Sequence, residues 1–273
     1  DKEALKLGIK SAIESKIKDY GFFTPQRKLL HGETVIAFGA SEMLMLALKK
    51  KSIDAAVTVC DGAGTVVTDN AEVVQGIGGR MNSLLLTSPI KEIIARLKEL
   101  NCHVVFASAL IDQVKGVEKA IESGYKKIAV TVSGHDSEIL KRIRRLEASG
   151  NVTVTILVVC TTGISKEKIN DIRDHADIVW SCASWDIRKT IGAMALLQVS
   201  KQIPVFVLTQ KGIDLITAYV DDSEHLSGLN TGKQYLISNE AGGRKVTLGG
   251  HNCFLREETL PVLYEKSFAM ATS

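Results

Sequence analysis

The sequence predicts an α/β protein with a mainly parallel sheet of Rossmann-like βα repeats, an N-terminal helix and a small C-terminal β-hairpin. Continuous apolar, β-branched runs alternate with stretches of helical spacing, which is typical of strands covered by helices on both faces. The composition agrees, because 45% of the 273 residues are hydrophobic and only 5% are aromatic. A TIM-like barrel is the alternative, since about seven or eight βα units can be counted. We favour the open sheet because residues 61–89 interrupt the repeat.

The N-terminal segment, residues 1–33, is expected to pack on the core through an amphipathic helix. Its aliphatic side chains recur every four residues, at Leu5, Ile9, Ile13 and Ile17. Gly21 is a typical helix stop. A helix that lies on a membrane is the alternative, but the aliphatic stripe is narrow and lacks Trp or Phe anchors. We therefore interpret this helix as a structural element.

The α/β core is expected to span residues 34–220, as one body or two lobes. Strands are expected near 34–38, 54–60, 103–107, 127–132, 152–160, 177–182 and 204–209. Helices are expected near 41–50, 90–100, 113–123, 136–148, 165–175, 185–200 and 211–219. This alternation predicts parallel strands joined by helical crossovers.

The C-terminal segment, residues 221–273, differs from the core because Ser, Gly, Asn and Asp are frequent in it. Two short β-like runs, Gln234–Ser238 and Lys245–Leu248, flank residues 240–244. They predict a hairpin with a Gly-Gly turn. A last helix is expected near 257–267.

Composition excludes several classes of function. The 34 basic and 31 acidic side chains leave a net charge of only +3, so nucleic acid is not an expected partner. No apolar run approaches the roughly 18 residues that span a bilayer, and the N-terminus lacks a signal-peptide pattern, so we expect a cytoplasmic protein with no membrane partner. An odd number of cysteines, 5, does not suggest a disulfide framework.

Three predicted strands end in a cysteine, at Cys60, Cys160 and Cys182. The carboxyl ends of parallel strands lie on one edge of a sheet, so these thiols are expected to face one crevice. Three thiolates with one open position suit an iron–sulfur cluster or zinc. Cys253, beside His251, is a candidate fourth ligand. The alternative is that cysteine simply tolerates a buried strand end.

The same strand ends lead into loops of small residues, whose backbone amides can approach an anion closely. The candidate ligand-binding residues in these loops are Gly62, Gly64, Ser133, Gly134, Thr161, Thr162, Gly163 and Ser184. The sequence therefore predicts a small anionic molecule as ligand. For any single loop the alternative is a short turn that is rich in Gly and Ser for geometric reasons.

A glycine-rich stretch at residues 75–80 ends in Gly78, Gly79 and Arg80. It lacks the Gly-Lys-Ser/Thr ending of a P-loop, so we interpret it as a flexible lid whose arginine clamps an anion. A tight turn that exposes Arg80 is equally compatible with the pattern. Among acid–base candidates, Asp61 follows Cys60 and His135 follows another predicted strand, where catalytic groups stand in open α/β sheets.

Two stretches carry a family resemblance: CDGAGTVVTDNAEVVQGIGGRMNSLLLTSPI (Cys60–Ile90) and ADIVWSCASWDIRKTIG (Ala176–Gly192). They resemble the methanogenesis marker 8 family, proteins of methanogenic archaea without an established activity. The resemblance covers nearly the whole chain. It implies an anaerobic archaeal cytoplasm and a role in methane metabolism, such as maturation of an enzyme or cofactor. It supplies no catalytic residues, but an oxygen-free setting favours an exposed iron–sulfur cluster.

Three functional hypotheses follow. The first is an enzyme or maturation factor with a metal centre at the three cysteines and a small anionic substrate. The second is a ligand-binding or scaffold protein in which the crevice holds a metabolite and the cysteines are incidental. The third is a partner of a larger methanogenesis assembly without chemistry of its own. Oligomeric state and ligand identity do not follow from the sequence.

Overall fold

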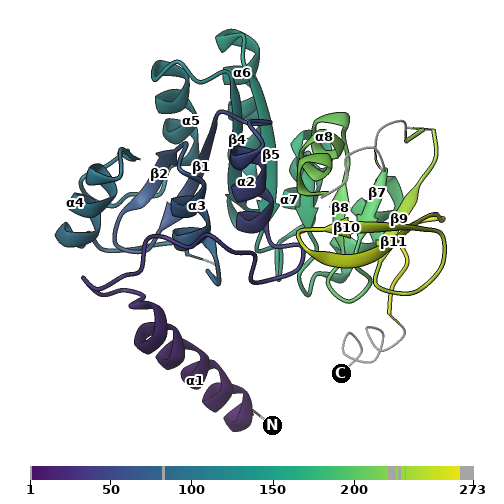
Figure 1. Ribbon diagram of the computed structural model, residues 1–273, viewed down its shortest axis with the longest axis horizontal. Helices are drawn as coiled ribbons and strands as arrows, with labels where there is room; N and C mark the ends of the chain where they lie inside the picture. Colours follow the sequence, from purple (N-terminus) through teal and green to yellow (C-terminus); the bar gives the residue numbers. More distant parts are fainter. Residues whose placement is uncertain (1, 82–83, 221–225, 227–228, 231, 265–273) are drawn as a thin grey trace.

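One sheet extends through the molecule and carries helices on both faces (Figure 1). The computed structural model describes residues 2–81, 84–220, 226, 229–230 and 232–264. The helices are α1 (Lys2–Tyr20), α2 (Ala40–Lys49), α3 (Ala71–Gly78), α4 (Lys91–Glu99), α5 (Gln113–Glu122), α6 (Leu140–Gly150), α7 (Lys166–His175) and α8 (Gln210–Tyr219). Shorter 3₁₀ or π turns are η1 (Gly134–Ile139), η2 (Ile187–Ile191) and η3 (Gly192–Met194).

The strands are β1 (Ala55–Cys60), β2 (Gly64–Thr68), β3 (His103–Val104), β4 (Lys127–Ser133), β5 (Thr153–Val159), β6 (Ile178–Trp180), β7 (Leu197–Val199), β8 (Val205–Val207), β9 (Tyr235–Ser238), β10 (Arg244–Leu248) and β11 (His251–Glu257). Their order is β10-β11-β9-β7-β8-β6-β5-β4-β1-β2-β3. The centre, β1-β4-β5-β6, is parallel, and the flanking strands are largely antiparallel. The α/β prediction is confirmed, and the barrel alternative is wrong because the order is open.

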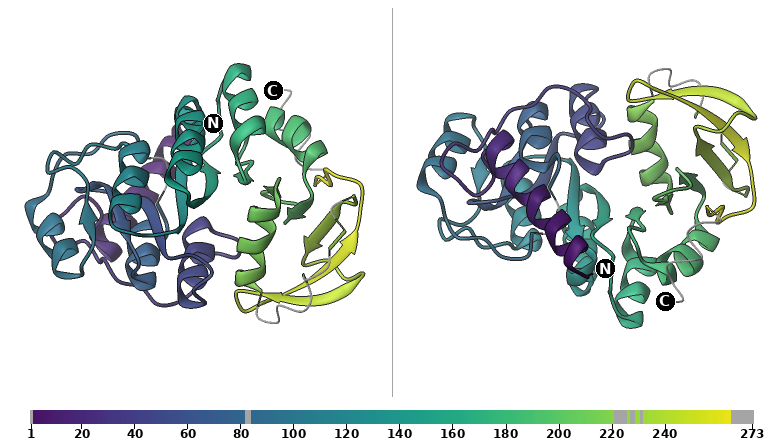
Figure 2. Two further views of the ribbon diagram at one scale, coloured as in Figure 1. Left: turned by 90° about the horizontal axis from the view of Figure 1, so that it is seen from above. Right: turned by 90° about the horizontal axis from the view of Figure 1, so that it is seen from below.

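The two faces of the parallel centre explain its continuous apolar strands. Along β4, Ile128, Val130 and Val132 pack with α5, α6, α7 and η2, whereas Ala129 joins the core beneath α2 and α8. Alternate side chains of a strand point to opposite faces, so both sets must be apolar when both faces are covered. Figure 2 shows β9–β11 at the end of the molecule opposite α4.

The expected strand at 34–38 is wrong. This segment, which we call the crossing segment, lies between the C-terminal strands and the start of α2 and does not join the sheet (Figure 1). Side chains hold it instead: the Trp180 indole N–H donates to the Phe38 carbonyl oxygen at 2.9 Å, and the Phe38 N–H donates to the Tyr219 hydroxyl at 3.4 Å. Phe38 has φ +65°, which no regular strand allows.

Two elements in residues 61–89 were not expected. Residues 61–63 close a hairpin between β1 and β2, and α3 follows it. The expected helix at 185–200 is also too long, because it ends at Met194 and β7 begins at Leu197. Short antiparallel strands of three to five residues carry too little periodicity to be separated from a neighbouring helix.

The C-terminal hairpin exists, but its partners differ from the prediction. β10 pairs with β11 through a turn at Gly249 and Gly250, both with positive φ, and β11 separates β10 from β9. Residues 251–257 therefore form a strand, and residues 258–264 are not helical. The remainder of the expected last helix lies outside the described residues.

The helix α1 forms as predicted but does not bury its aliphatic stripe. Leu5, Ile9, Ile13 and Ile17 are 65%, 52%, 46% and 39% exposed, so the expectation that this helix packs on the core is wrong. It projects beneath the sheet (Figure 1). Among the described helices, none has the length and apolar character needed to cross a membrane.

Candidate functional site

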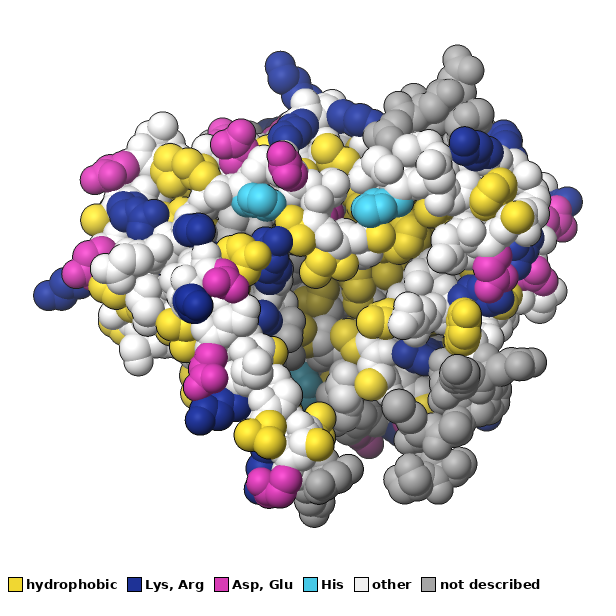
Figure 3. All heavy atoms as spheres, turned by 60° about the horizontal axis from the view of Figure 1, so that its bottom comes forward, with side chains coloured by type: hydrophobic (Ala, Val, Ile, Leu, Met, Phe, Trp, Pro, Cys, Tyr) yellow, Lys and Arg dark blue, Asp and Glu magenta, His cyan; other side chains and the backbone are white. Residues whose placement is uncertain are grey.

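The carboxyl ends of β1, β4, β5 and β6 lie side by side, and we call this side of the sheet the carboxyl edge. Cys60, Cys160 and Cys182 stand at or just after strands that end there, as predicted. Figure 3 looks onto this edge and shows a hollow with apolar side chains between the two halves of the molecule. This hollow is the candidate site.

Apolar side chains at the carboxyl edge belong to the margin of the core beneath α2 and α8. Phe38, Val159 and Cys182 pack against this core and are partly exposed, and Trp180 is 9% exposed. The hydrogen bond from Trp180 to Phe38 ties the crossing segment to β6. The edge therefore offers an apolar surface next to the end of β6.

Arg188 brings a buried positive charge beside Cys182. The residue is 8% exposed, and one terminal nitrogen donates to the carbonyl oxygens of Cys182 at 2.6 Å and Gln202 at 3.4 Å. Its Nε has no hydrogen-bond partner, and no carboxylate of the described residues compensates its charge. Burial lowers the pKa of Arg188, since desolvation disfavours the charged form. A buried charge without a counter-charge costs several kcal/mol, on the order of 3–5.

Ser181 adds a second unsatisfied group to the same turn of chain. It is 0% exposed, and its hydroxyl oxygen has no partner. The backbone links it closely to Arg188, because Ser184 N–H donates to Ser181 O at 2.9 Å and Arg188 N–H donates to Ser184 O at 3.2 Å. The turn after β6 therefore holds a buried hydroxyl and a buried guanidinium N–H that both lack an acceptor among the described residues.

The predicted threonines hold the loops that follow β5 and β6 together. Thr161 Oγ1 donates to Trp180 O at 2.7 Å, and Thr162 Oγ1 accepts from Ala183 N–H at 3.2 Å. Ser184 Oγ accepts from Ile187 N–H at 3.3 Å and so begins the helical turn that carries Arg188. These side chains position the site through internal bonds. Gly163 is exposed with φ +76°.

The loop after β4 lies against the loop after β5. A Cβ on Gly134 would be 3.1 Å from Thr161 Cγ2 and 3.3 Å from Cys160 O, closer than an ordinary van der Waals contact. Ser133 Oγ accepts from His135 N–H at 3.2 Å and caps η1. His135 is half-buried, and its carbonyl accepts from Lys168. Its predicted catalytic role stays a prediction.

Asp61 is a structural carboxylate. It is 0% exposed, and its two oxygens accept from Arg27 Nε at 2.8 Å and from Phe23 N–H at 2.6 Å. Arg27, 1% exposed, also donates to the carbonyl oxygens of Lys28 and Ile77. This pair anchors the segment after α1 to the core, and no acid–base role follows from its geometry.

Cys60 lies apart from the other two strand-end thiols. β4 separates its strand from β5, and Cys60 is buried in a different core with α3 and α4, where its thiol donates to Asp61 O at 3.2 Å. Burial and the neighbouring Asp61 carboxylate raise the pKa of Cys60. Cys253 is buried on β11. Among the described residues, no three His, Cys, Asp or Glu side chains come close enough to hold a metal ion.

The loop of small residues at Gly62 and Gly64 is followed by the strand β2 and not by a helix. The two glycines form the β1–β2 turn with φ +78° and +69°. The Gly62 N–H donates to Thr87 Oγ1 at 2.8 Å, and a Cβ on Gly62 would be 2.8 Å from Ile93 Cδ1. The turn is covered by the chain around α4, so its amides are engaged internally.

The flexible-lid interpretation of residues 75–80 is also wrong, because residues 75–78 belong to α3. Gly78 is the last residue of α3, and Gly79 is its C-cap with φ −60°. Arg80 has φ +61°, and its guanidinium carbon lies 4.2 Å from the ring centroid of Tyr20, at the end of α1. Arg80 therefore connects two helices. A contact with a ligand stays a prediction for this residue.

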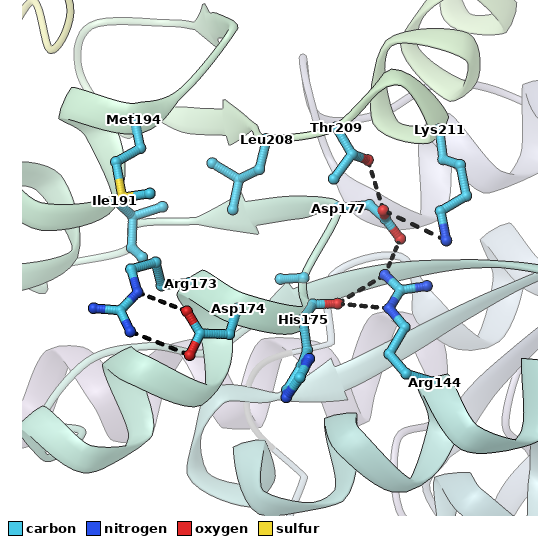
Figure 4. Close-up of a pocket in the computed structure, with 11 residues that line it drawn as sticks. Arg144, Arg173, Asp174, His175, Asp177, Ile191, Met194, Leu208, Thr209 and Lys211 are labelled. Atoms are coloured by element: carbon cyan, nitrogen blue, oxygen red, sulfur yellow. Dashed lines mark hydrogen bonds and ion pairs between the residues drawn. The ribbon is translucent and has the colours of Figure 1, made fainter. Parts of the chain in front are cut away.

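A cavity of about 230 Å³ lies at the edge of the sheet opposite the carboxyl edge, where β6 begins (Figure 4). Its charged side chains satisfy one another. Each of the N–H groups of Arg144 donates to protein oxygen, at His175 O, Val154 O, Glu147 and Asp177. Asp177, 0% exposed, also accepts from Thr209 Oγ1 at 2.6 Å. We take the carboxyl edge as the candidate site because Arg188, which lies there, has no acidic partner among the described residues.

Sequence reasoning found Cys182 and Ser184 but missed Arg188 and Ser181. The sequence does contain a signal: Ser184 and Arg188 are four residues apart, so a helix starting at Ser184 turns Arg188 back towards the strand end. What the sequence does not show is that this arginine is buried without an acid beside it.

Comparisons with known proteins place the chain among archaeal proteins. A family model described as "Uncharacterized protein conserved in archaea (DUF2099)" matches residues 2–221. An uncharacterized protein of Methanocaldococcus jannaschii is 40% identical over 222 residues, which cover 81% of this chain and 77% of the relative. The family match includes both the crossing segment and the turn that carries Arg188.

Proposed function

The chain belongs to the archaeal DUF2099 family, and we propose that it binds a small anionic molecule at the carboxyl edge, next to Cys182. The observation that carries the proposal is the buried, uncompensated guanidinium of Arg188. A folded protein retains such a charge at a cost unless a ligand supplies the counter-charge.

The arrangement suits a carboxylate or a phosphate group. Arg188 has an Nε–H and Ser181 has a hydroxyl without a hydrogen-bond partner among the described residues, and both groups donate to anionic oxygen. The carbonyl oxygen of the half-buried Cys182 accepts from Arg188, which supports a ligand position near this cysteine.

The test compares Arg188→Gln with Arg145→Gln, a more exposed arginine on α6. In a thermal-shift and calorimetry screen with inorganic phosphate and acetate, the wild type should bind at least one of them. Arg188→Gln should weaken that binding by about 10- to 150-fold, which corresponds to about 1.5–3 kcal/mol for a hydrogen bond to a charged group. Arg145→Gln should leave it unchanged.

Protein stability distinguishes this role from a structural one. If Arg188 only holds the fold through its hydrogen bonds to Cys182 O and Gln202 O, Arg188→Gln lowers the free energy of unfolding by about 1–3 kcal/mol and leaves anion binding unchanged. If its charge serves a ligand, added phosphate or acetate raises the melting temperature of the wild type and not that of Arg188→Gln. A large destabilisation with unchanged anion binding contradicts the proposal.

Metal binding is a second candidate function, favoured by one observation. Cys160 and Cys182 are both half-buried and follow the neighbouring strands β5 and β6. An iron–sulfur cluster or zinc held there would need ligands beyond these two thiols. Anaerobic purification followed by iron, sulfide and zinc analysis of wild type and Cys182→Ser tests it. The same metal content in both proteins contradicts it.

A role in methanogenesis, including maturation of an enzyme or cofactor, is part of the proposal only through the relative from Methanocaldococcus jannaschii. Its test is co-purification of the native protein from a methanogen, with Arg188→Gln as the comparison. Loss of a specific partner in that variant would connect the anion site to an assembly.

A further inference from the structure

We infer that the ligand of this site is an amphipathic anion: a carboxylate or phosphate carried on an apolar body that lies against Phe38, Val159 and Cys182. The inference rests on the proposed function, because the anionic end is assigned to Arg188. It goes further by assigning the apolar surface next to it.

The first argument is the apolar character of the carboxyl edge. Phe38, Val159 and Cys182 are partly exposed and pack against the same core, which includes Trp180. Figure 3 shows apolar side chains in the hollow at this edge. Binding sites for small molecules are typically apolar surfaces with a few polar groups that fix orientation. A purely polar anion such as inorganic phosphate would leave this surface unused.

The second argument is the conformation of Phe38. A bulky side chain with φ +65° is rare, and such strain persists only when surrounding contacts hold it. Here the contacts are the hydrogen bonds to Trp180 and Tyr219. Together they fix the backbone of Phe38 beside the Trp180 indole, while its ring lies 6.5 Å from the His251 ring, centroid to centroid. A ligand body can pack on the exposed part of this ring.

The third argument is the proximity of apolar and charged groups. Cys182 belongs to both parts of the site, since its side chain packs on the apolar core and its carbonyl oxygen accepts from Arg188. A ligand whose anionic group reaches Arg188 therefore has its next atoms beside Cys182. An apolar body attached at that point gains by leaving water.

The experiment is a titration with straight-chain carboxylates from acetate to octanoate, followed by the fluorescence of Trp180 and Trp185. These are the chain's 2 tryptophans, and they flank Cys182. Affinity should rise roughly three- to fourfold for each added methylene group, as for burial of a CH₂ group. Phe38→Ala should weaken octanoate about tenfold and change acetate by less than about twofold.

Phe23→Ala is the matched control, because Phe23 also has positive φ, +60°, and is 49% exposed, but donates its N–H to Asp61 far from β6. It should not change octanoate affinity. If acetate and octanoate bind equally while Arg188→Gln abolishes both, the anion site stands and the amphipathic class is overturned. If octanoate binds equally well to wild type and Arg188→Gln, the proposed anion site itself fails.

Discussion

At the scale of single residues, the pairing of buried charge distinguishes the structural carboxylates from Arg188, the proposed ligand-binding residue. Asp177 and Asp61 are both fully buried, and each carries a charge that an arginine and backbone N–H groups compensate. Arg188 is buried nearly as deeply and has no such acid among the described residues. Both kinds of side chain look alike in the sequence.

Asp177→Asn should lower the free energy of unfolding by about 1–3 kcal/mol, because it removes a fully buried carboxylate that accepts from Arg144, although Glu147 still pairs with this arginine. Asp174→Asn is the control, since Asp174 pairs with Arg173 on the surface, and it should cost no more than about 1 kcal/mol. Urea denaturation measures both. Equal effects would mean that the Asp177 network adds nothing beyond an exposed ion pair.

At the scale of elements, glycine has opposite roles in two helices. Gly76 lies in α3 where a Cβ would be 2.1 Å from the carbonyl oxygen of Leu29, so the helix packs directly on the backbone of the segment after α1. Gly8 lies in α1, where an added Cβ would meet no atom of the described residues within 4 Å. The first glycine is required by packing and the second is not.

Gly76→Ala should therefore destabilise the protein by about 1–3 kcal/mol through overpacking, although alanine is the better helix former. Gly8→Ala should instead increase the helicity of α1, with a gain of up to about 1 kcal/mol for that helix. Circular dichroism and thermal denaturation read out both variants. A stabilising Gly76→Ala would show that α3 can move away from Leu29.

At the scale of the whole molecule, burial divides the five cysteines into two groups. Cys160 and Cys182 are half-buried at the carboxyl edge. The other three are buried, Cys60 and Cys102 in one core and Cys253 in another. Burial raises the pKa of Cys60, Cys102 and Cys253, so each keeps its proton above the pH at which a free thiol ionises. Ionisation in the unfolded state then makes stability fall as pH rises above about 8.5.

Iodoacetamide should consequently modify Cys160 and Cys182 first in the native protein, because the thiolate is the reacting species and needs access. Cys60, Cys102 and Cys253 should stay protected until the protein unfolds, because burial shields these thiols and raises their pKa values. Peptide mass spectrometry over time resolves the order. Labelling of Cys60 at the rate of Cys182 would contradict the burial described for β1.

Local patterns in the sequence determined the fold class and most of the parallel centre. Apolar runs near 54–60, 127–132, 152–160 and 177–182 predicted β1, β4, β5 and β6, because strands buried on both faces need continuous apolar sequence. The same patterns placed Cys160 and Cys182 at one edge of the sheet, since parallel strands end on the same side.

Only the tertiary structure decided which of those strand ends is a candidate site. In the structure, Cys60 is buried in a core and Asp61 pairs with Arg27. The glycines at 76–79 belong to α3 and its C-cap, and residues 34–38 lie outside the sheet. Arg188 is also buried without an acid among the described residues. Contacts between distant residues depend on which surfaces of the helices and strands pack together. The hydrophobic periodicity of the sequence does not specify that packing.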